Sequence, residues 1–298
     1  MAPPVVAVVL SWNRREDTLA CLRSLAQVDY PRLRVVVVDN ASTDGSADAV
    51  AVEFPDVDLM RNALNRGYAG GMNDGIERAL AFDSDYVLLL NNDVEVEPGF
   101  LSALVEEAAR APDAAAVSPV IVFADRADLV WYAGARFDPA RGYNGRITGY
   151  REPVSRFTHV TETERAAGTA TLIPRPVLER VGMFDEELFA YSEDTDWSLR
   201  ARAAGYRLLV VPAARVRHKV SLSSGGENSP TTLYYGLRNA LVVAERHAPL
   251  GRVRTWRRRA VLVAVHLLQA LRSNRRREAF AAVLDGWLDW RRGRLGPR

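Results

Sequence analysis

The chain has 298 residues, of which 48% are hydrophobic and only Cys21 is a cysteine, so it can bury a full core but forms neither an internal disulfide nor a cysteine metal cluster. Its net charge of +2 is unevenly divided: residues 252–298 carry thirteen arginines against three acidic residues, a net charge of +10, which leaves −8 for the rest. Because the positive charge is confined to this tail, we do not expect a nucleic-acid-binding protein.

The first predicted elements are a strand at residues 5–10 and a helix at residues 16–27. The strand is an unbroken apolar run, which is typical of a strand buried on both faces in a parallel sheet. Ser11, Asn13 and Arg14 follow it directly. We expect their side chains near the crevice at the carboxyl edge of the sheet, where open α/β sheets bind ligands.

A second strand at residues 33–38 ends at Asp39, and a polar turn leads into a helix at residues 47–54. Asp44 and Ser46 are residue types that cap helices. Asp39 differs from them because it stands at the strand end, where a carboxylate can accept a hydrogen bond from the N3–H of uracil or thymine. Asp39 is therefore a candidate for pyrimidine recognition.

The apolar strand, Asp39 and the turn Ser42-Thr43-Asp44-Gly45-Ser46 resemble the opening of family 2 glycosyltransferases with the GT-A fold. The resemblance extends over about residues 5–224, and within the family the chain resembles the rhamnosyltransferase-like branch. It implies an α/β fold with a mostly parallel central sheet flanked by helices, and an inverting enzyme that uses a nucleotide-sugar donor. We expect Ser11, Asn13, Arg14 and Asp39 to contact the nucleotide.

A glycine-rich segment at residues 65–75 follows a short predicted strand at residues 56–60. Glycines let a backbone approach a ligand closely, and a helix beginning near Gly70 would direct its first amides at an anion. The same composition is also found in ordinary tight turns. Family members place this segment beside the nucleotide, and Arg66 would add a charge-assisted contact to a phosphate. The residues that match the family spacing are Asn65, Gly67, Gly71 and Asn73.

An apolar strand at residues 85–90 stops at Asn91-Asn92-Asp93, and Glu95 follows. Their oxygen atoms suit Mg²⁺ or Mn²⁺ carried on a diphosphate, and the same residues also form ordinary turns. The resemblance identifies this position as the Asp-X-Asp metal motif of the family, with Asn91 in place of the first aspartate. It implies Asp93 and Asn91 as metal ligands and Asn92 as a nucleotide contact, with the neutral Asn91 lowering the charge of the site.

A helix is predicted at residues 100–110 and a strand at residues 116–123. The segment 125–161 has the composition of a loop, with interspersed aromatic residues. Aromatic and polar groups together suit the faces and hydroxyls of a sugar ring, and they equally suit a small β-hairpin with a packed face. The aromatic residues concerned are Trp131, Tyr132, Phe137, Tyr143 and Tyr150.

A second acidic cluster lies at Glu193-Asp194, ahead of a predicted helix at residues 195–204. Inverting transfer requires a base opposite the leaving group, and a carboxylate can serve as that base. The family carries a Glu-Asp motif here, which implies Asp194 as the general base and Glu193 as a residue that orients it or binds acceptor hydroxyls. The alternative is an acidic first helical turn stabilised by the helix dipole. Asp196 and Arg200, four residues apart, are expected to form a structural ion pair.

His218 and Lys219 follow a strand predicted at residues 206–211 and a short continuation. Lone histidines usually pack in a core or lie at the surface, but relatives carry a metal-binding histidine at this place, so the resemblance implies His218 as a metal ligand. Lys219 would neutralise the departing diphosphate. The serine- and glycine-rich run at residues 221–226 has the composition of a mobile loop that closes over the donor.

From residue 231 onward the chain is predicted to be helical, with basic clusters around apolar segments at residues 260–271 and 280–290. The first segment is too short to span a bilayer, which needs about 20 apolar residues. Trp256, Trp287 and Trp290 beside arginines suit the surface of an anionic membrane. An oligomer interface or a packed pair of helices fits the same pattern.

We therefore expect a glycosyltransferase domain at residues 1–227, with its nucleotide-sugar half ending near residue 98 and its acceptor half at 99–227, and a helical basic extension at 228–298. The expected reaction moves one sugar from a UDP- or dTDP-sugar to a hydroxyl of a glycan, lipid-linked glycan or natural product, with Mg²⁺ or Mn²⁺ as cofactor. The absence of a Gln-X-X-Arg-Trp motif argues against a processive synthase.

Two other functions fit parts of the pattern. A sugar-phosphate nucleotidyltransferase needs a glycine-rich loop after the first strand, but residues 11–14 contain no glycine. A non-catalytic binder of nucleotide sugars or carbohydrates is favoured by Asn91 and disfavoured by Asp93 and Asp194. Residues 1–4 lack the pattern of a signal peptide, so we expect a cytoplasmic protein. Peripheral contact with the inner face of the cell membrane and dimerisation through the C-terminal helices both stay open.

Overall fold

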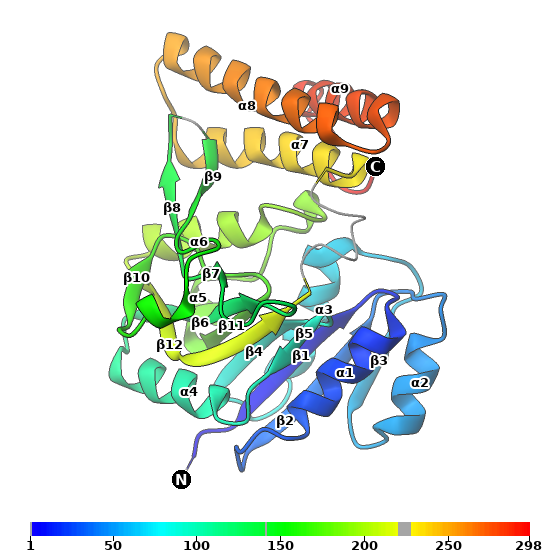
Figure 1. Cartoon of the computed structure of the whole chain (residues 1–298), viewed down its shortest axis with the longest axis vertical. Coiled ribbons are helices and arrows are strands. Elements are labelled where there is room, and N and C mark those ends of the chain that lie inside the picture. Colours follow the sequence, from blue (N-terminus) through cyan, green and yellow to red (C-terminus); the bar gives the residue numbers. More distant parts are fainter. Residues whose placement is uncertain (1, 141, 220–227) are drawn as a thin grey trace.

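The computed structural model describes residues 2–140, 142–219 and 228–298. Within these residues a ten-stranded sheet has helices on both faces, and three further helices stand at one end of this layer (Figure 1). The strands are β1 Val5–Ser11, β2 Leu33–Asp39, β3 Asp58–Arg61, β4 Tyr86–Asn91, β5 Val94–Val96, β6 Ala114–Phe123, β7 Val130–Tyr132, β8 Ala135–Asp138, β9 Gly142–Ile147, β10 Thr161–Thr163, β11 Ala170–Pro174 and β12 Arg207–His218. The helices are α1 Arg15–Leu25, α2 Ser46–Glu53, α3 Gly67–Leu80, α4 Phe100–Arg110, α5 Arg175–Val181, α6 Glu193–Ala203, α7 Pro230–His247, α8 Arg252–Arg272 and α9 Arg276–Arg291.

The strand order brings the polar strand ends together. It runs β10-β12-β6-β11-β4-β1-β2-β3, with β5 on β12 and β7 on β6, while β8 and β9 form a separate hairpin. Strands β4, β1, β2 and β3 are parallel, and β11 is antiparallel to both of its neighbours. Ser11 pairs with Asp39, and Leu10 pairs with Asn91. The polar residues that end these strands therefore lie at one edge of the sheet.

Successive residues of strand β1 face opposite sides of the sheet and enter two different apolar clusters. Val9 belongs to a cluster with Leu22 of α1, whereas Val8 belongs to a cluster with Ile76 of α3 and Trp197 of α6. Helix α3 lies close to the sheet, since a Cβ on Gly75 would be 2.2 Å from Cγ1 of Val8. Burial on both faces explains why these strands are apolar runs, and the expected mostly parallel sheet flanked by helices is confirmed.

Helices α7, α8 and α9 share an apolar cluster of their own, which includes Leu237, Leu262 and Val283. Trp287 and Trp290 pack against this cluster and against each other, with ring centroids 4.8 Å apart, whereas Trp256 is exposed. The described helices include none with the length and apolarity needed to cross a bilayer. The tryptophans of the tail thus have two different environments, which the sequence pattern did not separate.

Three local predictions need correction. The strand predicted at residues 206–211 continues to His218, with a shift of register between Val211 and Arg215, because Pro212 cannot donate a ladder hydrogen bond. Helix α3 begins at Gly67 rather than near Gly70. The segment 125–161 is not a plain loop, because it contains β7 and the β8–β9 hairpin, so the hairpin interpretation is confirmed there.

Candidate active site

A cavity of about 530 Å³ lies beyond the carboxyl ends of β1 and β4. Its walls come from distant parts of the chain: the strand ends, the start of α6, the end of β12, and the inner faces of α7 and α8. The polar residues that line it include Asn91, Asp93, Glu193, Asp194, His218 and His266. Both chemical clusters predicted from the sequence therefore face the same cavity.

Buried polar atoms without a hydrogen-bond partner are concentrated at this cavity. In the described part of the chain they are Oδ1 of Asp39, Asn91 and Asp93, Nε of Arg165, Oε2 of Glu193, and Nδ1 of His218. Five of these residues line the cavity, and Asp39 immediately precedes the lining residue Asn40. An unsatisfied buried polar group costs about 1–3 kcal/mol, so such a concentration indicates a site built for a polar ligand.

Asp93 and His218 form the candidate metal site. Nε2 of His218 lies 3.3 Å from Oδ1 of Asp93, and both side chains are about 5% exposed. The pairing of His218 with Val94 across β12 and β5 places them together, and the ring of Trp131 packs edge-on against the imidazole at 4.6 Å. The described residues contain no group of three or more His, Cys, Asp or Glu able to hold a metal alone.

These residues nevertheless fit a divalent cation that arrives with a ligand of its own. Asp93, Asn91 and His218 each keep an unpartnered polar atom, and their oxygen and imidazole donors suit Mg²⁺ or Mn²⁺. Lys219 does not line the cavity, because its ammonium group is paired with Asp17 at 2.7 Å and Glu95 at 3.6 Å. Its contact with a diphosphate stays a prediction. The loop at residues 221–226 lies outside the described residues.

We call the sheet edge at the ends of β1, β2 and β4 the donor end, because the donor is expected to bind there. Within it, Asp39 is 4% exposed. Its Oδ2 accepts from the backbone amide of Ser42, which leaves Oδ1 as an unpartnered acceptor. Asn13 supports this end from the neighbouring loop, because its backbone amide donates to Oγ of Ser42 and its side-chain Oδ1 accepts from the backbone amide of Thr43. The carboxylate predicted to recognise a pyrimidine is therefore held in place with one acceptor atom available.

Ser11, Arg14 and Asn92 also belong to this support. The hydroxyl of Ser11 bonds that of Thr18, and Arg14 pairs with Asp17. Asn92 lines the cavity while its amide donates to Thr18 and to the carbonyl of Asn13. Ser11, Asn13 and Arg14 do not line the cavity themselves, so their direct contact with a nucleotide stays a prediction.

The glycine-rich segment is shaped by close backbone packing. Gly67 has φ +72°, and a Cβ there would lie 2.3 Å from the carbonyl oxygen of Phe189, so only glycine fits. Oδ1 of Asn65 accepts from the amide of Gly67 at 2.8 Å and from the side chain of Asn40 at 3.0 Å. Asn65 and Gly67 line the cavity, as the sequence predicted for residues beside a ligand.

Three other residues of this segment have internal partners and do not line the cavity. The guanidinium of Arg66 is paired with Asp74 and Glu186. The amide of Asn73 donates to and accepts from the backbone of Phe184, which ties α3 to the segment before α6. Gly71 allows α3 to approach Leu10 and Asn40. A phosphate contact by Arg66 and nucleotide contacts by Gly71 and Asn73 stay predictions.

Glu193 and Asp194 form the first turn of α6. Glu193 is 6% exposed with no partner for Oε2, and burial, followed by the charge of Asp194, raises the pKa of Glu193 to about 8. Asp194 is half-buried, and its Oδ2 accepts from the backbone amide of Gly168 at 3.4 Å. Near neutral pH Glu193 therefore keeps its proton and can donate a hydrogen bond into the cavity.

Tyr68 connects the two chemical clusters. Its hydroxyl donates to the carbonyl of Gly168, and its pKa is raised by burial and then by the charges of Glu193, Asp194 and Asp93. Tyr68 also lines the same cavity as these three carboxyl groups, so the metal end and the α6 end belong to one site. Tyr68 was not predicted as a site residue, although it lies within the glycine-rich segment that matches the family pattern.

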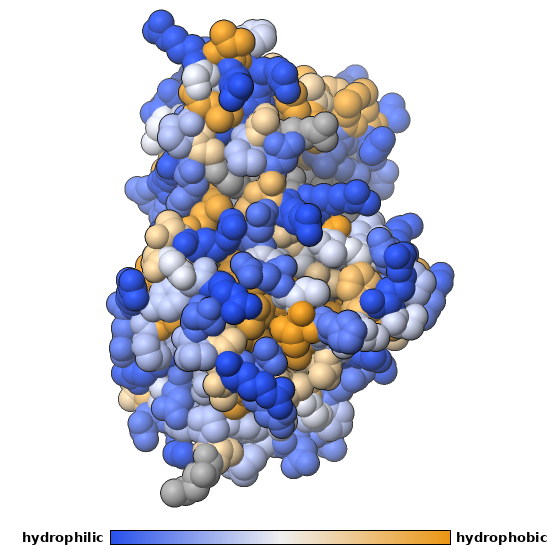
Figure 2. All heavy atoms as spheres, turned by 90° about the vertical axis from the view of Figure 1, so that its left-hand side faces the viewer, coloured by the Kyte–Doolittle hydropathy of each residue, from blue (hydrophilic) through white to orange (hydrophobic). Residues whose placement is uncertain are grey.

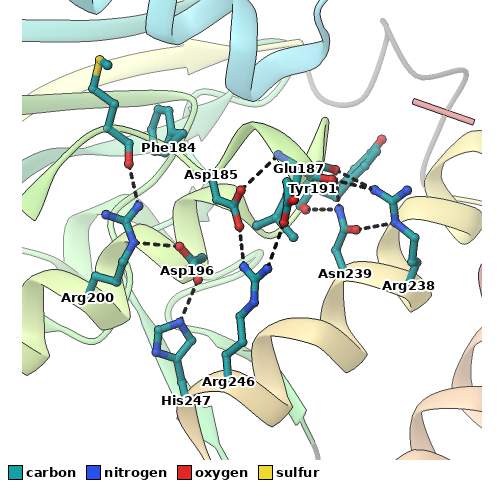
Figure 3. A network of polar contacts seen from close by, with 12 residues as sticks. Phe184, Asp185, Glu187, Tyr191, Asp196, Arg200, Arg238, Asn239, Arg246 and His247 are labelled. Carbon is teal, nitrogen blue, oxygen red and sulfur yellow. Dashed lines mark hydrogen bonds and ion pairs between the residues drawn. The ribbon is translucent and has the colours of Figure 1, made fainter. Parts of the chain in front are cut away.

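The backbone that leads into α6 is strained and is held from α7. Phe189, Tyr191 and Ser192 all have positive φ, at 63°, 68° and 70°. The side-chain amide of Asn239, which is fully buried, donates to the carbonyls of residues 188, 190 and 191 at 2.8, 2.8 and 2.7 Å (Figure 3). This network fixes the segment immediately before Glu193 and Asp194.

Arg238, also fully buried, completes this support. Its guanidinium donates to the carbonyl of Leu188 at 3.0 Å, next to Asn239 (Figure 3). It also donates to the carbonyl of Gly296, near the carboxyl end of the chain, at 2.7 Å. No local pattern in the sequence predicts these contacts, because they join residues about fifty positions apart. A buried polar pair within an apolar helical stretch was the available signal.

Behind the acidic turn, Asp196 has a structural role. Its carboxylate is paired with Arg200 at 2.8 Å, as predicted, and with Nε2 of His247 at 2.7 Å (Figure 3). The guanidinium of Arg200 also donates to the carbonyls of Val181 and Met183. Asp196 therefore joins α6 to α7 and is separate from the pair that faces the cavity.

The aromatic residues of the segment 125–161 have different positions. Trp131 and Tyr132 line the cavity, whereas Phe137 packs in a cluster below α7 and Tyr150 packs edge-on against Phe123. The side chain of Tyr143 lies outside the described residues. The carbohydrate-binding interpretation is therefore restricted to the first two residues and stays a prediction.

Comparisons with known proteins identify relatives along most of the chain. The family model described as "Glycosyltransferase like family 2" matches residues 3–240. The N-acetylglucosaminyl-diphospho-decaprenol L-rhamnosyltransferase of Mycobacterium tuberculosis is 31% identical over 299 residues, which cover 92% of this chain and 96% of that protein. The dTDP-rhamnosyl transferase RfbF of Shigella flexneri is 28% identical, with 83% of this chain and 82% of that protein covered.

Solved structures show the same fold at low identity. The crystal structure of GalNAc-T7 with UDP, GalNAc and Mn²⁺ has a TM-score of 0.63 at 18% identity and covers 80% of this chain, which spans 47% of that chain. The mannosyltransferase PcManGT from Pyrobaculum calidifontis, in complex with GDP-Man and Mn²⁺, has a TM-score of 0.58 at 20% identity, with 97% and 76% covered. At these identities the likeness carries the fold alone.

The family match covers well over half of the chain, and the Mycobacterium relative is matched over nearly its whole length. The expectations of a nucleotidyltransferase and of a non-catalytic binder are therefore set aside. The chain belongs to glycosyltransferase family 2, has the GT-A fold, is similar to the rhamnosyltransferases of that family, and is a glycosyltransferase.

Proposed function

We propose that this enzyme transfers one rhamnose-type sugar from a dTDP-sugar to a hydroxyl group of a lipid-linked sugar, with inversion at the anomeric carbon. The names of two relatives support the donor and the acceptor, since one is a dTDP-rhamnosyl transferase and the other acts on N-acetylglucosaminyl-diphospho-decaprenol. The unpartnered Oδ1 of Asp39 suits the N3–H of thymine, and it suits uracil equally. The names of the relatives therefore support dTDP as the nucleotide. The carboxylate of Asp39 supports the wider class of donors that carry thymine or uracil.

The donor diphosphate belongs at the carboxyl end of β4 in this proposal. Asp93, His218 and Asn91 would hold a divalent cation there, and a bound Mg²⁺ or Mn²⁺ supplies positive charge that stabilises the leaving diphosphate. Since the residues that the structure describes offer too few ligands for a closed site, the phosphate oxygens of the donor are needed to complete the coordination. Metal binding and donor binding are therefore expected to be coupled.

Asp194 is the proposed general base. The acceptor oxygen forms a bond to the anomeric carbon, the bond from that carbon to the β-phosphate oxygen breaks, and the hydroxyl proton passes to the carboxylate of Asp194. Glu193 is unsuited to this task near neutral pH, because its raised pKa of about 8 keeps it protonated. Its proton is instead available to an acceptor hydroxyl or to a phosphate oxygen.

One observation carries the proposal: the unpartnered atoms of Asn91, Asp93, His218 and Glu193 all belong to residues lining a single cavity, which Asp194 also lines. A leaving-group site and a base in one cavity are the two requirements of a direct displacement. Tyr68 lines the same cavity as the acids of both ends.

The test is a panel of dTDP-, UDP- and GDP-sugars offered with a polyprenyl-diphosphate-linked N-acetylglucosamine, scored for release of nucleoside diphosphate with Mn²⁺, Mg²⁺ or chelator. We expect release from dTDP-L-rhamnose that requires the acceptor and is lost with the chelator. NMR of the product should show the anomeric configuration opposite to that of the donor. Turnover of GDP-sugars alone, or a product with retained configuration, would contradict the proposal.

A further inference from the structure

Helix α8 is buried on one side and apolar on the other. Its inner side carries the buried residues Leu262 and Ala270 together with Arg258 and His266. Its outer side carries an apolar stripe at helical spacings of three and four, made of Val253, Trp256, Ala260, Ala264, Leu267, Leu268 and Leu271. Val253, Trp256 and Leu268 are 82%, 72% and 59% exposed. A helix on the surface of a globular protein normally turns polar residues outward, so this α8 stripe requires a partner.

Unpaired positive charge accompanies the α8 stripe. Arg254, Arg257 and Arg272 lie on the same helix, and the tail as a whole has a net charge of +10 against −8 for the rest of the chain. Figure 2 shows apolar and strongly polar side chains side by side at the end of the molecule that these helices form. Eight exposed arginines of the tail form no ion pair within the described residues: Arg252, Arg254, Arg257, Arg272, Arg276, Arg277, Arg291 and Arg292.

We propose that the α8 stripe binds the surface of an anionic lipid bilayer. The stripe would insert among the acyl chains, and the arginines would contact the negative headgroups. A second copy of the chain is disfavoured as the partner, because a two-fold contact through this face would bring the unpaired arginines of one copy against those of the other. The seven apolar residues of the stripe have no counterpart on a phosphate backbone, so a nucleic acid is disfavoured too.

The position of α8 links this surface to the cavity. His266 and Gln269, on the inner side of the helix, line the cavity. A helix with its side chains is about 10–12 Å across, so docking the outer side would bring the bilayer surface to about one helix diameter from the cavity wall. This geometry gives the enzyme access to an acceptor whose lipid carrier stays in the membrane, a step that rests on the proposed function.

The experiment is flotation of the full-length protein with vesicles of phosphatidylcholine alone or with 30 mole per cent phosphatidylglycerol, at low and high salt. We expect binding to the anionic vesicles that weakens with salt. The double variant Leu267→Glu/Leu268→Glu should reduce the partition coefficient at least roughly tenfold, since it removes two exposed apolar side chains that would insert into the bilayer. Arg254→Ala/Arg257→Ala should reduce it about thirtyfold, at about 1 kcal/mol for each arginine near the surface.

Matched controls come from the body of the protein. Val52 and Leu64 are 83% and 64% exposed, and the double variant Val52→Glu/Leu64→Glu should leave flotation unchanged. Arg15→Ala/Arg126→Ala, at two exposed arginines of the body, should do the same. Circular dichroism melting curves of all variants test that each one is folded, so that a loss of binding in a folded protein is meaningful.

Equal binding to neutral and anionic vesicles, or unchanged flotation of both tail variants, would overturn the proposal. It would also be overturned by a lipid-free dimer in light scattering that disappears in Leu267→Glu/Leu268→Glu, together with failure of the wild type to float. The assay contains neither donor nor acceptor. Its failure would therefore leave the proposed transfer reaction untouched, and failure of the transfer reaction would leave the docking result standing.

Discussion

The donor end and the catalytic end of the cavity both contain strained backbone, but they are held in different ways. The catalytic end is the start of α6, with Glu193 and Asp194. At the donor end, Asn13, Arg14 and Ala41 have positive φ, and the nearest support is the contact of Asn13 with Ser42 and Thr43 in the neighbouring loop. At the catalytic end, the strained segment 189–192 is held by Asn239 of α7, and the carbonyl of Glu187 just before it accepts from the backbone amide of Gly296. The donor end is thus a local property of the sheet edge, whereas the catalytic end depends on the helical extension.

This difference indicates a division of labour. Changes near β1, β2 and β4 should act on binding of the donor and its cation. Changes at α6 and α7 should act on the chemical step, because they move or remove the base while the strand ends stay in place.

The largest effect is expected for Asp194→Asn. Removal of the base should lower kcat about 10²- to 10⁴-fold, with the melting temperature close to that of the wild type, because the side chain is half-buried and the amide is isosteric. Steady-state kinetics with saturating donor and acceptor measure it. Asp56→Asn, at an exposed aspartate of the body, is the matched control. Wild-type kcat in Asp194→Asn would refute the assignment of the base.

Asn239→Ala tests whether α7 positions the base. The variant leaves the carbonyls of Ala190 and Tyr191 without their side-chain donor, whereas that of Leu188 keeps Arg238. At about 1–3 kcal/mol for each unsatisfied buried group, the free energy of unfolding should fall clearly. Well below the melting temperature, kcat should fall up to roughly 10²-fold through misplacement of Asp194, while the KM for the donor stays unchanged.

Asn274→Ala, at an exposed asparagine between α8 and α9, is the control for Asn239→Ala. A purely structural role would lower stability and leave kcat of the folded fraction as it is. That result would break the link between the helical extension and catalysis.

The sequence revealed the donor end better than the catalytic end for a physical reason. Asp39 and Asp93 stand where apolar strands stop, and the register of parallel strands brings such ends together without further information. His218 was assigned through the family pattern, and the antiparallel pairing of β12 with β5 brings it to Asp93. Strand ends and turns leave local signals in a sequence.

Contacts between distant elements leave no such signal. Neither the donation from Asn239 to the segment 188–191 nor the position of Tyr68 among three acids follows from spacing. Lys219 and Arg66 show the reverse case, because both were predicted beside phosphate from their place in the chain. In the structure each has carboxylate partners supplied by another element, namely Asp17 for Lys219 and Glu186 for Arg66.

A smaller effect is expected at the metal end. Asn91→Asp adds the missing carboxylate beside Asp93 and should lower the Mn²⁺ concentration for half-maximal activity roughly tenfold. Without metal the added buried charge should lower the melting temperature, and Mn²⁺ with dTDP should raise it more than in the wild type. Asn274→Asp is the control. An unchanged Mn²⁺ dependence would place the cation away from Asn91.

The last prediction concerns the pH dependence of stability rather than activity. Burial and Asp194 raise the pKa of Glu193 to about 8, whereas glutamate in an unfolded chain titrates near about 4.3. Between these values the folded state holds the extra proton, so the stabilisation from protonated Glu193 is complete below the unfolded pKa and is lost as pH rises through the folded one.

Glu193→Gln removes this dependence. The stability advantage of the wild type over the variant should therefore decrease by on the order of 1.4 kcal/mol for each pH unit in that window, as measured by urea denaturation from pH 5 to 8. Parallel curves for the two proteins would show that Glu193 is ionised in the fold.

The division between the two ends is tested most directly by calorimetric titration of dTDP-sugar and Mn²⁺ into Asp194→Asn and Asp93→Asn. We expect Asp194→Asn to bind the donor with wild-type affinity while it fails to turn over, and Asp93→Asn to lose the Mn²⁺-dependent part of donor binding. Loss of donor affinity in Asp194→Asn, or intact Mn²⁺-dependent binding in Asp93→Asn, would contradict the separation of donor binding at the strand ends from catalysis at α6.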